Sequence, residues 1–151
     1  MNDVHTLQRQ QWVPRPIQEV FAFFSEARNL EALTPSWLRF EILTPASIEV
    51  VRGAKINYRL RWHGLPLRWT TEIVQWDPPH SFEDIQLSGP YRSWHHTHRF
   101  EETAGGTRLT DIVRYSMPFG LLGRLVYALS VRRNVEQIFD YRSQIIRTLF
   151  G

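Results

Sequence analysis

The sequence contains no cysteine and only one lysine. The absence of cysteine excludes disulfide bonds, cysteine nucleophiles, thiolate zinc sites and iron–sulfur clusters. Lys55 is the single lysine, and the other seventeen basic residues are arginine. A mechanism that forms a Schiff base on lysine is therefore not expected.

Long apolar runs are also missing from the chain. The N-terminal segment MNDVHTLQRQQWVPRP is polar and has no apolar signal core. The longest apolar stretch, Phe119–Val131, is shorter than the roughly 20 residues of a membrane span and contains Arg124. These absences predict a cytoplasmic protein without stable membrane insertion.

Sequence motifs for nucleotides and nucleic acids are absent as well. The formal net charge is +3, but the arginines are scattered apart from the pair Arg132 and Arg133. No nucleic-acid-binding motif, nucleophile elbow, phosphate loop or dinucleotide fingerprint is present. We therefore expect no nucleic-acid partner and no cofactor.

The composition is that of an ordinary globular domain with many aromatic side chains. Of the 151 residues, 42% are hydrophobic and 22% are charged, while 13% are aromatic, including six tryptophans. This length predicts a single domain over residues 1–151. The aromatic content fits either a large core or an aromatic-lined pocket.

Apolar periodicity and turn residues give a consistent order of elements. A strand over residues 5–13 precedes a helix with Pro16 as its first residue and a second short helix over 26–33. The predicted strands that follow span residues 38–44, 54–64, 66–77, 80–87, 91–103 and 107–117. Pro118 and Gly120 then open a long amphipathic helix that runs to the end of the chain.

This order predicts an α+β fold in which a curved antiparallel sheet of about seven strands wraps around the C-terminal helix. The apolar positions expected on that helix are Leu122, Leu125, Leu129, Val135, Ile138, Phe139, Ile145, Ile146 and Leu149. We also expect Leu121 and Val126 to lie in the core.

Several longer strings resemble the START/polyketide-cyclase superfamily, often called SRPBCC, which has the helix-grip fold. They are WDPPHSFEDIQLSGPY, WHHTHRF, TRLTDIVRYSMPFG and IFDYR. The chain is similar to the bacterial single-domain ligand-binding branch, whose members are also labelled cell-division-inhibitor-like. The resemblance implies a cavity between sheet and long helix that takes an apolar or aromatic small molecule.

The strand that contains WHHTHRF has two histidines between apolar anchors. If Trp94 and Phe100 face the cavity, strand alternation brings His96 and His98 to the same side and turns His95 outward. The same argument on other strands turns further side chains inward. These are Asp84, Gln86, Asp111 and Tyr115, with Tyr58, Trp62 and Trp69 further along.

Three interpretations of this inward polar face remain open. The histidines and carboxylates could pair only to fix the fold. They could instead orient the polar end of a ligand. In the third interpretation, His96 or His98 acts as a general base, oriented by Asp84 or Asp111, with Tyr115 as proton donor.

The spacing His-x-His is also compatible with metal ligation, with a carboxylate as third ligand, but this pattern is a weak signal and we assign no metal. Arg132 and Arg142 flank the apolar stripe of the helix, where either could bind an anionic ligand group or simply pack its stem.

The sequence thus predicts a domain that binds a hydrophobic or aromatic small molecule in an internal cavity. One alternative is an enzyme of the cyclase, dehydratase or hydrolase type that uses the inward histidines and aspartates. The other is a regulatory interaction module without a ligand, which would show a filled interior and an exposed apolar patch.

Overall fold

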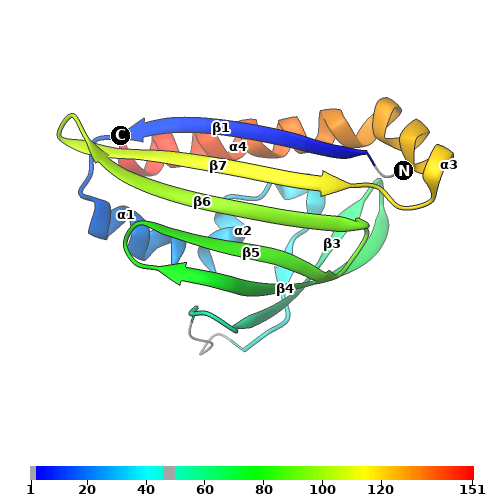
Figure 1. Cartoon of the computed structure of the whole chain (residues 1–151), viewed down its shortest axis with the longest axis horizontal. Helices are drawn as coiled ribbons and strands as arrows, with labels where there is room; N and C mark the ends of the chain where they lie inside the picture. Colours follow the sequence, from blue (N-terminus) through cyan, green and yellow to red (C-terminus); the bar gives the residue numbers. More distant parts are fainter. Residues whose placement is uncertain (1–2, 46–49) are drawn as a thin grey trace.

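The computed structural model describes residues 3–45 and 50–151, and seven strands in this part of the chain form one antiparallel sheet (Figure 1). The strands are β1 (Val4–Val13), β2 (Glu41–Ile42), β3 (Lys55–Trp62), β4 (Leu65–Asp77), β5 (Ser81–Ser88), β6 (Ser93–Thr103) and β7 (Gly106–Ser116). Their spatial order is β1-β7-β6-β5-β4-β3-β2. The predicted α+β helix-grip architecture is confirmed.

Short turns join the strands from β3 to β7 into successive hairpins. Two of these turns contain only two residues, His63-Gly64 and Ala104-Gly105, and all four residues have positive φ, as a twisted hairpin requires. The strand predicted over residues 38–44 is much shorter in the structure. A 3₁₀ turn (Ser36–Leu38) occupies its beginning, which leaves only β2 to pair with β3.

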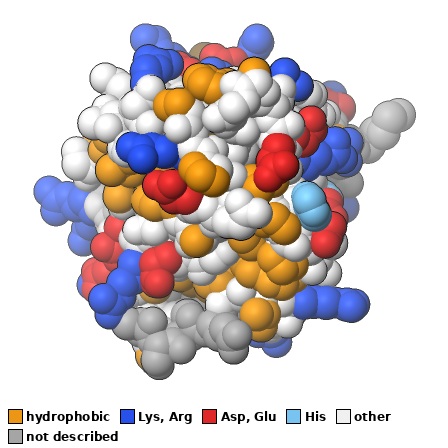
Figure 2. All heavy atoms as spheres, turned by 90° about the vertical axis from the view of Figure 1, so that its left-hand side faces the viewer, with side chains coloured by type: hydrophobic (Ala, Val, Ile, Leu, Met, Phe, Trp, Pro, Cys, Tyr) orange, Lys and Arg blue, Asp and Glu red, His pale blue; other side chains and the backbone are white. Residues whose placement is uncertain are grey.

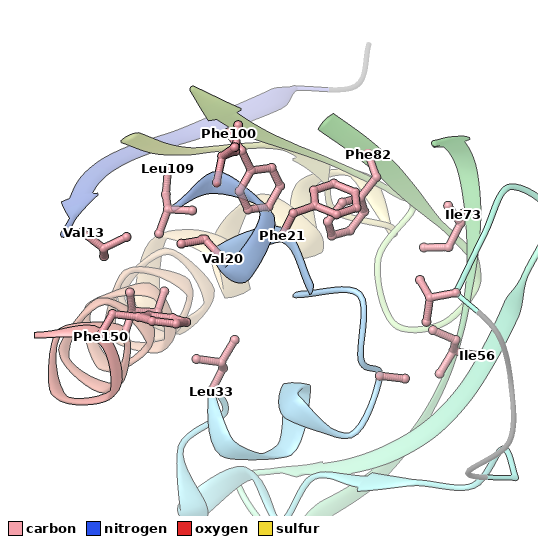
Figure 3. Packing of buried hydrophobic residues seen from close by; sticks show 14 residues of the cluster. Val13, Val20, Phe21, Leu33, Ile56, Ile73, Phe82, Phe100, Leu109 and Phe150 are labelled. Atoms are coloured by element: carbon pink, nitrogen blue, oxygen red, sulfur yellow. The ribbon is translucent and has the colours of Figure 1, made fainter. Parts of the chain in front are cut away.

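Two short helices follow β1, as predicted. They are α1 (Ile17–Phe24) and α2 (Asn29–Ala32). Pro16 is not the first helical residue of α1, because its ψ of 146° is extended and it stands at the N-cap instead. In Figure 3, Phe21 of α1 lies between Phe82 and Phe100 of the sheet, and its ring centroid is 5.2 Å from that of Phe100.

The C-terminal helix consists of three consecutive segments. These are α3 (Gly120–Val126), the π-helical turn η2 (Tyr127–Val131) and α4 (Arg132–Phe150). α4 runs behind β1 and β7 (Figure 1). Its buried residues are Val135, Phe139, Arg142, Ile146 and Phe150, which recur at three- and four-residue spacing.

The first half of this helix corrects the sequence prediction. Leu121, Leu122, Leu125 and Leu129 were expected in the core, yet they are 79%, 61%, 55% and 76% exposed. The reason is that α3 extends beyond the end of β7 (Figure 1), so the sheet does not cover this face. Leu149, near the other end of the helix, is also exposed at 49%.

Among the described residues, no helix combines the length and the apolar character that crossing a membrane requires.

Candidate functional site

A cavity of about 530 Å³ lies between the inner face of the sheet and the C-terminal helix. Alternation along two strands supplies much of its wall. β3 contributes Ile56, Tyr58, Leu60 and Trp62, and β4 contributes Leu67, Trp69, Thr71 and Ile73. The cavity is therefore lined mainly by aromatic and aliphatic side chains, as is usual for small-molecule sites.

Aromatic rings meet edge to face at one part of this wall. The ring centroids of Trp69 and Trp94 are 5.1 Å apart with an interplanar angle of 88°. Tyr91, from the connection between β5 and β6, packs against both tryptophans. Such edge-to-face contacts fix ring orientation and give the cavity a rigid aromatic end.

Polar side chains interrupt the apolar wall on β5 and β6. Asp84, His96 and His98 all line the cavity, and both histidines are buried, at 6% and 4% exposure. His95 points away from the cavity and lies 3.2 Å from Glu83 on the outer face. The side-chain directions on β6 thus follow the alternation set by Trp94 and Phe100.

Each inward histidine bonds to a different carboxylate, on a different neighbouring strand. The Nε2 atom of His96 lies 2.8 Å from Asp111 Oδ1 on β7. The Nε2 atom of His98 lies 2.7 Å from Asp84 Oδ2 on β5. The two imidazole rings stack at 3.6 Å, so the four side chains form one continuous row across three strands, called here the polar row.

Arg142 of α4 closes the polar row from the helix side. Its Nη2 atom lies 3.3 Å from Asp111 Oδ1, the oxygen that His96 also contacts. The guanidinium carbon sits 5.0 Å from the ring centroid of Phe24, within cation–π range. Arg142 is 7% exposed, so its positive charge is buried together with a carboxylate partner.

Burial and pairing shift the pKa values of this row. Burial lowers the pKa of His98 to about 4, and the neighbouring His96 acts in the same direction. Burial alone would raise the pKa of Asp84 and of Asp111. At Asp84 the hydrogen bond from His98 and the charges of the row together outweigh burial. At Asp111 the charge of Arg142 and the hydrogen bond from His96 act together in the same way, so both pKa values are lowered.

A neutral His98 facing an ionised Asp84 has a defined tautomer. The carboxylate only accepts hydrogen bonds, so Nε2 carries the proton and Nδ1 is left as an acceptor. That Nδ1 atom is 3.6 Å from Asp111 Oδ1, beyond hydrogen-bond distance. It is buried without a hydrogen-bond partner in the described structure, as are Trp69 Nε1 and Arg142 Nε. All three residues belong to the cavity wall.

Of the ten residues predicted to bind ligand, seven line the cavity: Tyr58, Trp62, Trp69, Asp84, Trp94, His96 and His98. Gln86, Asp111 and Tyr115 do not. The Gln86 amide donates to the Tyr91 carbonyl at 2.8 Å and accepts from the Tyr91 N–H at 3.1 Å, so it fixes the β5–β6 turn.

Asp111 and Tyr115 lie behind the cavity wall for different reasons. Asp111 is screened by the histidines and Arg142, to which it is bonded. Tyr115 packs among other aromatic rings, with His5 of β1 at 5.5 Å and Trp94 at 5.6 Å between centroids. Burial raises its phenol pKa.

Sequence reasoning missed part of the wall. Tyr91 lies in a turn, Leu30 on the four-residue helix α2 and Leu38 on the 3₁₀ turn, and such segments are too short to show a clear periodicity. Asn134 of α4 also lines the cavity and donates to Ser130 Oγ at 3.3 Å. Periodicity gives no signal for turns, although Asn134 lies one helical turn before Ile138, which also lines the cavity, and this spacing was a helical cue.

The two arginines considered as anion ligands differ in place. Arg132 is absent from the cavity wall and its side chain is 68% exposed, 3.5 Å from Glu136. Arg142 lines the cavity, but Asp111 already engages its charge.

The polar row also holds a candidate set of metal ligands. Asp84, His96 and His98 each place one ligand atom within 4.8 Å of the others. However, the two histidine Nε2 atoms engage carboxylates on opposite sides of β6. A metal ion bound through these Nε2 atoms would have to displace their short hydrogen bonds.

A curved antiparallel sheet that encloses an apolar cavity against a C-terminal helix defines the helix-grip class of proteins. Residues 13–141 match the model of a family described as "Polyketide cyclase / dehydrase and lipid transport". The chain therefore belongs to this family, within the SRPBCC superfamily.

Solved structures from bacteria and a plant share the fold. Protein Ms6760 from Mycobacterium smegmatis is 19% identical, with a TM-score of 0.65 over 95% of this chain and 96% of its own. TTHA0849 from Thermus thermophilus is 18% identical, with a TM-score of 0.68 over 94% and 97%. The ginseng major latex-like protein 151 from Panax ginseng is 15% identical, with a TM-score of 0.58 over 89% and 96%. A search of curated proteins finds no match.

Proposed function

We propose that the cavity binds a hydrophobic or aromatic small molecule and that the polar row orients its polar end. The observation that supports this most is the cavity of about 530 Å³, which is large enough for a drug-sized ligand. A fold stabilised by tight packing alone gains nothing from such a space, because unfilled volume destabilises a core.

The orphaned polar atoms support the same proposal and suggest the polarity of the ligand. Trp69 Nε1 and Arg142 Nε are donors, whereas His98 Nδ1 is an acceptor, and a buried polar atom without a partner costs about 1–3 kcal/mol. A mostly apolar ligand with hydroxyl or carbonyl groups has the chemistry to engage them. Arg142 is neutralised by Asp111, so nothing in the row favours a strongly anionic ligand.

The enzymatic alternative is supported by the two His–Asp pairs, His98–Asp84 and His96–Asp111, because both histidines line the cavity. A pKa of about 4 makes His98 a weak base at neutral pH, however, because general bases work best with a pKa near the working pH. Tyr115, the expected proton donor, lies outside the wall. Binding is therefore the better-supported function.

A panel of fatty acids, sterols and polyphenols tests the proposal through tryptophan fluorescence and melting temperature. Three tryptophans line the cavity, so a bound ligand should change their emission and raise the melting temperature. Trp94→Ala should weaken binding by about tenfold or more, since a buried aromatic contact is lost. Trp12→Ala is the control, because Trp12 lies on β1 and is not part of the wall.

A double variant of the two inward histidines separates recognition from folding. Replacing His96 and His98 together by Gln retains hydrogen-bonding capacity, so affinity should fall more than stability if the row recognises ligand. Unchanged affinity with lowered stability would assign the row a structural role. If no compound in the panel alters fluorescence or melting temperature, the binding proposal is wrong for these ligand classes.

A further inference from the structure

A group of exposed apolar side chains lies where the cavity meets the surface. Its members, called here the leucine patch, are Phe119, Leu121, Leu122, Leu125 and Leu129, and all are more than half exposed. At 3.6 residues per turn, the four leucines fall within about a quarter to a third of the helix circumference. A continuous apolar face of this kind is a common feature of interaction sites.

The leucine patch continues directly into the cavity. Phe119 and Leu122 belong both to the patch and to the cavity wall. Across from them, Leu65 of the β3–β4 hairpin is 57% exposed and also lines the cavity. His63 in the same hairpin lies 3.0 Å from Ser130 Oγ of η2, which brings hairpin and helix together at this rim.

Gly123 and Pro118 determine which side of α3 faces outward. A side chain at Gly123 would collide with the Pro118 carbonyl oxygen, so the start of α3 packs closely on the segment that leaves β7. Gly123 is buried, whereas Leu121 and Leu125 on the other side of the helix are exposed. The leucines therefore point outward because the opposite side of α3 is held against the chain.

The charges along this part of the chain have a single sign. No aspartate or glutamate occurs between Asp111 and Glu136, while this interval contains Arg114, Arg124, Arg132 and Arg133. The opposite end of the molecule is different, because both signs of charge are interspersed with apolar groups there (Figure 2). A partner for the leucine patch should therefore be apolar at its centre and negative at its edge.

Two of these arginines have acidic neighbours from outside the interval. Arg124 lies 3.0 Å from Asp3, and Arg132 lies 3.5 Å from Glu136. All four side chains are about half exposed or more, and exposed ion pairs of this kind are weak. A phosphate headgroup can therefore compete for both guanidinium groups.

We propose that the leucine patch inserts into the interface of a membrane that contains anionic phospholipids, with the adjacent arginines on the headgroups. A leucine face flanked by arginine is the pattern of helices that lie in a membrane surface. A second copy of the chain fits less well, because a symmetric contact would bring the arginines of both copies together. The proposal does not depend on which ligand the cavity holds.

The docked orientation has a direct consequence for the cavity. Its mouth would face the bilayer, so an apolar molecule could pass between lipid and cavity without crossing water. Partial insertion of this kind needs no spanning helix and leaves the fold intact.

Co-sedimentation of the full chain with vesicles tests the proposal. The probes are vesicles of phosphatidylcholine alone and vesicles of phosphatidylcholine with phosphatidylglycerol. We expect binding to the anionic vesicles that weakens as salt increases. The double substitution Leu125→Gln and Leu129→Gln should reduce partitioning by about tenfold or more. Leu149→Gln is the matched control, since it removes an exposed leucine from the far end of the helix.

Substitution of the arginines provides an independent test of membrane binding. Arg132→Gln with Arg133→Gln should reduce binding about tenfold and flatten its salt dependence. Arg99→Gln with Arg108→Gln removes the same net charge from exposed positions on β6 and β7 and should have a much smaller effect. Circular dichroism melts of all variants verify that they are folded.

Three results would overturn the proposal. The first is an absence of binding to anionic vesicles by the unmodified protein. The second is an equal loss of binding in the patch variants and in their controls. The third is a dimer of the unmodified protein that forms with rising concentration in sedimentation velocity and is lost in the leucine variants, when none of these proteins binds to vesicles.

Discussion

His98 bonds to Asp84 although the strand register places Asp84 opposite His96. The β5–β6 register pairs Asp84 with His96 and Phe82 with His98. The imidazole of His98 nevertheless reaches Asp84 diagonally at 2.7 Å, and its ring stacks on Phe82 at 4.0 Å. The same crossing occurs on the other side, where His96 reaches Asp111, the residue opposite His98.

The burial of His98 leads to a prediction for pH dependence. The pKa of His98 is about 4 in the folded protein and about 6.5 when unfolded, so the unfolded chain binds more protons between these values. Stability should therefore be highest above pH 6.5 and fall as the pH drops toward 4, by up to about 3 kcal/mol. Urea unfolding at a series of pH values measures this slope.

His98→Gln should remove most of that slope, because it deletes the buried titrating group. His95→Gln, on the outer face of the same strand, is the control and should preserve it. A slope that persists in His98→Gln would assign the acid sensitivity to other groups.

Arg142 provides a second prediction, which concerns the acid limit of stability. Its guanidinium lowers the pKa of the Asp111 carboxyl, so Asp111 contributes stability that is lost only in strong acid. Arg142→Met should cost about 3–5 kcal/mol, because it leaves a buried carboxylate without its cation. It should also move acid unfolding to a higher pH, since the pKa of Asp111 rises. Arg142→Lys should recover part of the loss, and an unchanged acid midpoint in Arg142→Met would contradict the pairing.

The long helix offers a third prediction with an internal control. Phe139→Ala should lower the free energy of unfolding by about 3–5 kcal/mol, because Phe139 is buried against the sheet side of α4. Leu129→Ala, earlier on the same helix, should change it by about 0.5 kcal/mol or less, because Leu129 is 76% exposed. Calorimetry compares the two directly. Equal losses would mean that the first half of the helix is packed after all.

Register and tertiary pairing explain why some side chains were predictable and others were not. Alternation from Trp94 and Phe100 was sufficient to turn His96 and His98 toward the interior, because a strand has a side-chain period of two. On β5, alternation from Phe82 did the same for Asp84. The same reasoning misplaced Gln86. Its amide binds the backbone of Tyr91 in a turn that lies five residues further along the chain, a contact that periodicity does not describe.

The sequence by itself determined the order of the elements, the inward face of β3, β4 and β6, and the resemblance to a helix-grip family. These properties depend on local periodicity and turn chemistry, which a single chain displays directly. Only the tertiary structure decided the diagonal His–Asp bonds, the burial of Arg142 beside Asp111 and the exposure of the leucines on α3. Each of these depends on where one element ends relative to another, and helical spacing is identical whether or not a sheet lies beneath it.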